Sequence, residues 1–353
     1  MATRKVTSAQ EGPLPTSGGR DALRHTYHGR VPSIDERVVG SALGLALGDA
    51  LGAPFEFLRA RNIPEPIPAL ERPWLSEPPG STTDDTAMAR NLMRSLGACG
   101  RFDSADVLER HLEWFRSDPP DVGTLTGRVL RRVAAGEDPA AAAQAIWNER
   151  GPEVSAGNGS VMYCTPLGLA YANRPADLLE LAPPLSALTH VDGRCRTAVT
   201  AVTLGAAALV RGEPASDAAR AALSAVEDLE GGEELEFLVE AVGGSRAIDG
   251  PDQGFCLFTA GAAFQALVRP GDVETELRRV VSLGGDTDTN AAVAGALLGA
   301  RDGARGLPSG WLDRLRDCDA IRAEAEALIP LARISGDGQR PDTKAVFRDR
   351  PDR

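Results

Sequence analysis

The sequence predicts an all-α fold. Apolar residues make up 42% of the 353 residues, whereas aromatic residues account for only 5%. Runs of alanine and leucine, which favour helices, outnumber the alternating valine, isoleucine and threonine patterns that are typical of strands. No two alternating runs flank a tight turn in the way that predicts a β-hairpin. Because no shift in composition marks an internal boundary, we expect one helical domain over residues 33–334.

The two ends of the chain differ from this domain. Residues 1–32 and 335–353 are rich in glycine, proline, serine, threonine and charge, and they lack apolar periodicity. We expect both ends to be disordered tails, and the N-terminal one contains no apolar run of the signal-sequence kind. The one stretch near membrane-span length, 38–55, contains Asp49 and four glycines. A lipid-facing helix is therefore not expected, nor is a membrane partner.

The first predicted helix covers residues 37–52. Its glycines recur every four residues and therefore share one face of the helix: Gly40, Gly44, Gly48 and Gly52. Close packing of a second helix is the simplest reason for such a stripe. The chain then enters a turn in which Glu56 lies between two phenylalanines. Residues 63–80 are rich in proline, which predicts an irregular loop, and long loops of this kind often contribute to sites.

Further helical patterns follow, separated by breaks rich in proline and glycine. The predicted helices cover residues 86–96, 104–116, 125–135, 139–150, 161–173, 176–189, 194–211, 216–229, 234–242, 255–267, 273–283, 290–300 and 311–331.

Two of these helices begin at segments of similar composition, although the segments lie far apart in the chain. The segments are Thr82-Thr83-Asp84-Asp85-Thr86 and Gly284-Gly285-Asp286-Thr287-Asp288-Thr289. Aspartate and threonine are ordinary helix N-caps, and capping explains one residue at each place. Paired carboxylates repel each other unless a cation or a proton neutralises them, so a metal site is the second explanation. Oxygen ligands of this kind suit Mg²⁺, Mn²⁺ or Ca²⁺ better than zinc.

Three other segments carry polar groups at helix boundaries. The Gly157-Asn158-Gly159 loop precedes a helical run, so its amides could approach a phosphate, although such a sequence also forms ordinary turns. His190 lies at a helix boundary, where a structural or surface role is the simpler explanation. Asp121 follows two prolines and would ordinarily be a turn residue or a helix cap.

Composition restricts the partners and the compartment. The net charge of −12 argues against a nucleic-acid-binding protein, which normally has a basic surface. The five cysteines are odd in number and lack paired spacing, which is typical of free thiols in a reducing cytoplasm. We therefore expect a soluble, cytoplasmic monomer.

Taken together, these segments resemble the ADP-ribosylglycohydrolase family. The motifs occur in the order of the family: GLALGDALGAPFE at 44–56, TDDT at 83–86, DVG at 121–123, GNGSVM at 157–162, TH at 189–190 and GGDTDT at 284–289. The two aspartate-rich motifs are the most specific part. The resemblance implies a single compact domain of orthogonally packed helices. It also implies two Mg²⁺ or Mn²⁺ ions at the bottom of an ADP-ribose cleft.

The resemblance implies a role for each matching residue. The metal ligands would be Thr83, Asp84, Asp85, Asp286, Asp288 and Thr289. Glu56 matches a cleft glutamate near the scissile bond, and Asp121 falls where some members carry a catalytic aspartate. The diphosphate and ribose would be held by Gly157, Asn158, Gly159, Ser160 and Met162, and His190 would contact the ligand.

The implied activity is hydrolysis of the bond between ADP-ribose and an acceptor, with a protein side chain as the expected acceptor and ADP-ribose as the product. Two alternatives remain: a non-catalytic ADP-ribose-binding or structural relative, and a hydrolase of a small ADP-ribosyl metabolite. The chain departs from the family at Tyr163, where an arginine is usual, and at Ala156, where some members have an aromatic residue. These departures affect the expected substrate preference and leave the metal ligands intact.

Overall fold

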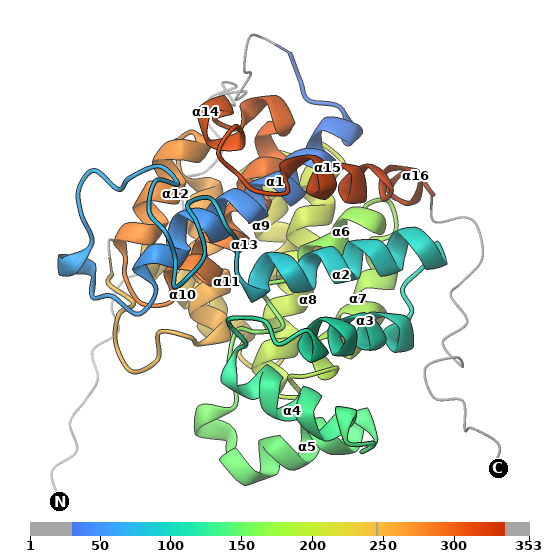
Figure 1. Ribbon diagram of the computed structural model, residues 1–353. Coiled ribbons are helices and arrows are strands. Elements are labelled where there is room, and N and C mark those ends of the chain that lie inside the picture. Colours follow the sequence, from blue (N-terminus) through green and yellow to red (C-terminus); the bar gives the residue numbers. More distant parts are fainter. Residues whose placement is uncertain (1–29, 245, 336–353) are drawn as a thin grey trace, which may run out of the picture.

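Helices form nearly all of the regular structure, as predicted. A computed structural model describes residues 30–244 and 246–335. Within these ranges extended backbone pairs only at two isolated bridges, Trp74 with Glu77 and Gly157 with Phe255, so the predicted all-α class is confirmed (Figure 1). The predicted tails lie outside the described residues, except for residues 30–32 and 335.

The helices run from Ile34 to Ala332. Their bounds are α1 Ile34–Gly52, α2 Asp84–Cys99, α3 Ser104–Arg116, α4 Thr124–Ala134, α5 Pro139–Arg150, α6 Thr165–Ala170, α7 Pro175–Ala187, α8 Gly193–Val210, α9 Ala215–Ser224, α10 Gly232–Gly243, α11 Cys256–Val268, α12 Val273–Ser282, α13 Thr287–Asp302, α14 Ser309–Leu312, α15 Cys318–Glu326 and α16 Ile329–Ala332. Short 3-10 turns cover Ala53–Phe55, Ala60–Asn62, Pro152–Val154 and Ala304–Gly306.

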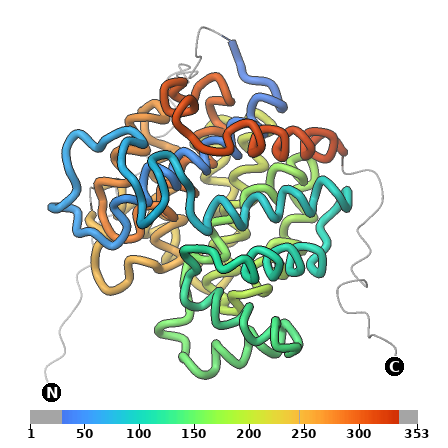
Figure 2. The backbone as a smooth tube through the Cα atoms, in the orientation of Figure 1, coloured from blue at the N-terminus to red at the C-terminus, as the bar shows by residue number. Residues whose placement is uncertain are grey.

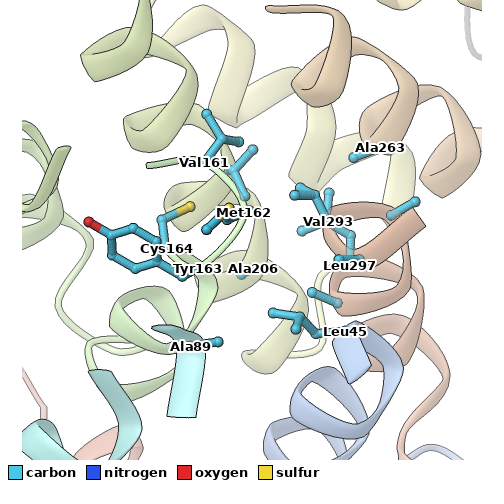
Figure 3. Close-up of a cluster of buried hydrophobic side chains, with 14 of the residues drawn as sticks. Leu45, Ala89, Val161, Met162, Tyr163, Cys164, Ala206, Ala263, Val293 and Leu297 are labelled. Carbon is cyan, nitrogen blue, oxygen red and sulfur yellow. The ribbon is translucent and has the colours of Figure 1, made fainter. Parts of the chain in front are cut away.

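Helix α1 is the central helix of the fold and packs along α13. The predicted glycine stripe lies at this contact, because a Cβ atom on Gly44 would overlap the carbonyl oxygen of Gly295 and one on Gly48 would overlap that of Ala291. Figure 3 shows Leu45 of α1 beside Leu297 of α13. By length and composition alone, Ile34–Phe55 could cross a membrane, but 94% of its most apolar window is buried within the protein. It is therefore a core helix.

Three predicted helices are wrong in extent. The helix expected over 216–229 ends at Ser224, after which the amides of Val226 and Leu229 close turns. The helix expected over 161–173 is confined to α6, because the amides of Val161 and Met162 both donate to the carbonyl of Asn158, at 2.7 and 3.1 Å, and close a turn instead. The helix expected over 311–331 is divided into α14, α15 and α16. Asp317 interrupts it by adopting a left-handed conformation with φ of 57°.

Two parts of the chain stand apart from the central helices. The proline-rich segment between α1 and α2 winds along one flank of the molecule (Figure 2). Helices α4 and α5 form a pair at the opposite edge from α15 (Figure 1), and they have a small apolar core of their own. This small core consists of Val129, Ala142, Ala143 and Ile146.

Candidate active site

The first acidic segment forms the start of α2. Thr83 is the N-cap of this helix, and its Oγ1 accepts a hydrogen bond from the Asp85 amide at 3.3 Å. Capping therefore accounts for Thr83, as the simpler explanation proposes. It leaves Asp84 and Asp85 unexplained, since both carboxylates are buried in the first turn. The Thr83 hydroxyl also donates to Oδ2 of Asp85 at 3.1 Å.

The second acidic segment forms the start of α13. Gly284 and Gly285 turn the chain with φ of 75° and 77°, and they deliver Asp286 and Asp288 to the buried first turn. The turn is bonded to the segment after α1: the Phe57 amide donates to the Gly285 carbonyl at 2.7 Å. Glu56 is thereby held beside α13. Its carboxylate and those of Asp286 and Asp288 offer oxygens that lie within 4.8 Å of one another.

The two acidic helix starts lie in contact with each other. The Thr289 hydroxyl of α13 donates to Oδ2 of Asp85 at 3.3 Å, although the two residues are 204 positions apart in the chain. Oδ2 of Asp85 thus accepts hydrogen bonds from a threonine of each segment. The fold brings the two halves of the predicted metal site together at the ends of three helices, α1, α2 and α13.

Burial and mutual repulsion raise the pKa values of these carboxyl groups. The pKa of Glu56 is raised to about 9 by burial and then by the charges of Asp286 and Asp121. Burial and the Asp121 charge raise the pKa of Asp84 to about 7. Burial also raises the pKa values of Asp85 and Asp288 well above the usual range. Without a bound cation, the cluster would hold protons at neutral pH.

The donor atoms fit a divalent cation. Within the described part of the chain, the Oδ1 atoms of Asp85, Asp286 and Asp288 are buried and have no hydrogen-bond partner. A buried carboxylate oxygen without a partner is costly unless a cation or proton satisfies it. All of the candidate ligands supply oxygen, which suits Mg²⁺ or Mn²⁺ better than zinc. The residues present therefore fit the metal that the sequence predicts.

Asp121 lies on the loop that precedes α4 and approaches the cluster from the side of α2. The Gly123 amide in the same loop donates to Oδ2 of Asp84 at 2.9 Å. The Asp121 side chain is half-buried, and burial raises its pKa above the usual value. Asp121 and Glu56 are thus two partly exposed carboxyl groups at the edge of a buried acidic cluster. This position suits a proton donor or acceptor.

The glycine loop is joined to the second acidic segment through Asn158. The side-chain Nδ2 of Asn158 donates to Oδ2 of Asp286 and to Oγ1 of Thr259, both at 2.9 Å. Its backbone amide donates to the Gly254 carbonyl at 3.0 Å. The Asn158 side chain therefore faces the acidic cluster and holds the loop against it. Binding of a ligand by the neighbouring glycines stays a prediction.

His190, Ser160 and Met162 support this loop from inside the protein. The His190 ring lies beneath it, since a Cβ atom on Gly159 would come within 2.8 Å of the ring. Burial lowers the pKa of His190 to about 4, so its ring is neutral at pH 7. The Ser160 hydroxyl lies 3.0 Å from that of Ser186, and Met162 is part of the core (Figure 3). Direct ligand contacts by these three side chains stay predictions.

Tyr163 has a different position from the one that its sequence context suggested. We expected this departure from the family to bear on substrate preference. The side chain is fully buried among apolar residues (Figure 3). Its ring packs edge-to-face on His111 with centroids 5.0 Å apart. Ala156 is buried as well. The tyrosine therefore fills the core and does not line a binding surface.

The sequence reasoning missed Asp49 as a residue of this site. Asp49 is fully buried in α1, and its carboxylate accepts hydrogen bonds from the amides of Thr83 and Thr86 and from the Thr86 hydroxyl. A signal existed, because Asp49 is the only charged residue between positions 38 and 55. A charge in an otherwise apolar helix needs a buried polar partner.

The fold and its paired acidic helix starts agree with the comparison of this chain with known protein families. The profile of the ADP-ribosylglycohydrolase family matches residues 30–338, which is most of the chain. The chain belongs to the ADP-ribosylglycohydrolase family.

Individual relatives agree with this assignment. The chain is 32% identical to the ADP-ribosyl-[dinitrogen reductase] glycohydrolase of Rhodospirillum rubrum, over 85% of this chain and 98% of that one. It is 29% identical to the human ADP-ribosylhydrolase ARH3, over 78% and 88% of the two chains. A solved ADP-ribosylglycohydrolase-related protein complex contains a chain with 36% identity and a TM-score of 0.71, with coverage of 85% and 99%.

Proposed function

We propose that this protein is a metal-dependent hydrolase that cleaves the glycosidic bond between ADP-ribose and an acceptor, with an ADP-ribosylated protein side chain as the substrate. The observation that carries the proposal is the set of three buried, unpartnered carboxylate oxygens on Asp85, Asp286 and Asp288. They lie where α2 and α13 begin, and Asn158 joins the glycine loop to the same place. Acidic helix starts and an amide-rich loop are what binding of a cation and a diphosphate requires.

The proposed ligands of two Mg²⁺ or Mn²⁺ ions are Thr83, Asp84, Asp85, Asp286, Asp288 and Thr289. When bound, such ions would neutralise the carboxylates and polarise the ribose hydroxyls and the attacking water. Glu56 and Asp121 would move the protons, one removing a proton from water and the other supplying one to the leaving group. Glu56 could instead be a further metal ligand, since its carboxylate lies close to those of Asp286 and Asp288.

The names of the relatives support a protein acceptor. One relative acts on ADP-ribosylated dinitrogen reductase, and another, 27% identical over 84% of this chain and 79% of its own length, is the ADP-ribosylarginine hydrolase Tri1 of Pseudomonas putida. Arginine is therefore the first acceptor to test, and serine is the second. A cytoplasmic location and a monomeric state belong to the same proposal.

Release of ADP-ribose from defined peptides tests this function. Purified protein and an Asp288→Ala variant are incubated with arginine- and serine-ADP-ribosylated peptides, with and without Mg²⁺, and free ADP-ribose is measured by chromatography. We expect release from at least one peptide by the parent protein with Mg²⁺ only, and none by the variant. Asp228→Ala, at an exposed position after α9, is the matched control and should behave like the parent.

Two results would contradict the proposal. Binding of ADP-ribose without release from either peptide would identify a non-catalytic relative. Hydrolysis of a small ADP-ribosyl metabolite but of neither peptide would assign a different substrate class.

A further inference from the structure

We propose that Asp49 is a positioning residue that sets the metal affinity of the site by holding the first turn of α2 in place. This inference rests on the metal centre proposed above, and it concerns a residue outside the set of predicted ligands. Asp49 lies in the last turns of α1, is fully buried, and directs its carboxylate at the acidic start of α2.

The contacts of Asp49 converge on that start. The Thr83 amide donates to Oδ1 at 3.0 Å and to Oδ2 at 3.1 Å. The Thr86 amide donates to Oδ2 at 3.1 Å, and the Thr86 hydroxyl donates to the same oxygen at 2.5 Å. These donors flank Asp84 and Asp85 in the sequence. A carboxylate from a neighbouring helix therefore fixes the residues on either side of the two candidate ligands.

Asp49 differs from the proposed metal ligands in its hydrogen bonds. Asp85, Asp286 and Asp288 each have a buried oxygen without a hydrogen-bond partner, whereas both oxygens of Asp49 accept hydrogen bonds. Hydrogen bonds to a carboxylate hold its orientation and its charge. Asp49 thus resembles the outer partners that orient metal ligands in proteins, and loss of such partners typically weakens metal binding.

The last turn of α1 also contacts the other half of the site. The Thr287 hydroxyl at the start of α13 donates to the Gly52 carbonyl at 2.8 Å. A Cβ atom on Gly52 would lie 2.5 Å from the Cα atom of Asp288, so the backbones of α1 and α13 touch at this point. Asp49 and Gly52 are within one helical turn of each other. One turn of α1 therefore sets the spacing between the two acidic helix starts.

Substitution of Asp49 should loosen one half of the site. In Asp49→Asn, the amide keeps one acceptor oxygen, and its NH₂ group would face the N–H donors of Thr83 and Thr86. The first turn of α2 would shift to relieve this contact, and the candidate ligands would shift with it. We expect the Kd for Mn²⁺ to rise by roughly 10–100-fold, the range found when outer-shell partners of metal ligands are lost.

A second pair of variants separates positioning from charge. Thr86→Val removes the hydroxyl donor to Asp49 and leaves every charge in place, whereas Thr86→Ser keeps the donor. If Asp49 acts by holding α2, Thr86→Val should raise the Kd in the same direction as Asp49→Asn, and Thr86→Ser should restore it. Ser41→Ala is the matched control, because Ser41 is a buried residue of α1 whose hydroxyl has no hydrogen-bond partner within the described residues.

The experiment is titration of each purified variant with Mn²⁺ in a calorimeter, after circular dichroism has established that its helix content equals that of the parent. Equal Kd values for the parent, Asp49→Asn and Thr86→Val would overturn the inference. A weakened Asp49→Asn beside an unchanged Thr86→Val would also overturn it, since charge alone would then be responsible. If the parent itself binds no Mn²⁺, the proposed metal centre fails, and the role of Asp49 fails with it.

Discussion

The backbone amide of Gly123 donates a hydrogen bond to Oδ2 of Asp84 at 2.9 Å. This bond connects the loop before α4 with the first turn of α2, and it places Asp121 at the edge of the acidic cluster. The loop that carries Asp121 and the helix start that carries the candidate ligand Asp84 are therefore joined by a hydrogen bond.

Asp121→Asn should lower kcat by about 10²–10⁴-fold, because an amide cannot transfer the proton that general acid or base catalysis requires. The Kd for Mn²⁺ should change little, since Asp121 is not among the proposed ligands. Steady-state kinetics and metal titration on one preparation measure both quantities. Glu56→Gln in parallel assigns the second carboxylate: a large rise in Kd for Mn²⁺ would show that Glu56 is a ligand.

Divalent cations should stabilise the protein by binding only its folded state. Mg²⁺ or Mn²⁺ at 100 times Kd should therefore add about 2.7 kcal/mol per bound ion to the free energy of unfolding. Thermal unfolding with and without EDTA provides the measurement. The increase in Tm should disappear in Asp288→Ala and persist in Asp228→Ala. A Tm of the parent protein that does not change with millimolar Mg²⁺ would contradict the proposed metal centre.

Gly48→Ala should destabilise the fold by about 1–3 kcal/mol, or more, because overpacking a close contact forces the backbones apart. The new methyl group would overlap the Ala291 carbonyl of α13. Gly310→Ala in α14 is the control, since a Cβ atom there meets open space. Urea unfolding of both variants gives the comparison. A Gly48→Ala protein as stable as the parent would mean that α1 and α13 do not touch here.

Acid should destabilise the protein through His111. This ring is fully buried, and burial lowers the pKa of His111 to about 3 in the folded state. An unfolded histidine titrates near 6.5, so the unfolded state binds the proton first as the pH falls. Stability is therefore full above about pH 6.5 and falls toward pH 3, by about 1.4 kcal/mol per pH unit.

His111→Phe tests this effect, because it keeps an aromatic ring beside Tyr163 and removes the titrating group. The free energy of unfolding is measured in urea for parent and variant at pH 7.5, 5.5 and 4.5. The value for the parent minus that for the variant should decrease as the pH falls. His190 and the carboxyl groups contribute equally to both proteins. A difference that is constant with pH would contradict a neutral, buried His111.

Tyr163→Arg, which introduces the residue usual in the family, should destabilise the protein without altering its acceptor preference. The position is fully buried against His111, and an unpaired charge there would cost about 3 kcal/mol or more. Tyr163→Phe should cost less, because it keeps the buried ring and loses only the hydroxyl, whose contact with the Leu185 carbonyl is long at 3.5 Å. Tm and the ratio of activities on the two peptides are the measurements. A stable Tyr163→Arg with changed preference would place position 163 at the substrate.

Local composition was sufficient to predict most of the helices. Helices α3, α5 and α12 begin within one residue of their expected positions. The exceptions arose where backbone geometry overrode composition. Asp317 adopts a left-handed conformation and interrupts the last predicted helix. Glycine or asparagine would have indicated such a conformation in the sequence, but the residue there is aspartate.

The site was predictable as residue types but not as contacts. Adjacent carboxylates at Asp84 and Asp85 indicated a cation, because capping needs only one side chain. The bond from Asn158 to Asp286 and the bonds to Asp49 depend on how helices meet, which spacing along one chain does not reveal. For the same reason Tyr163 was associated with substrate preference although its side chain lies in the core.

The separate small core of α4 and α5 has a consequence for motion. Elements with few contacts to the main body open locally at a lower free energy than the central helices, so amide hydrogens of α4 and α5 should exchange with deuterium sooner than those of α1 and α13. Such an opening would break the hydrogen bond from Gly123 to Asp84 and carry Asp121 away from the helix starts that hold the proposed metal ligands. While α4 and α5 are open, the protein would still hold its cations but could not hydrolyse substrate.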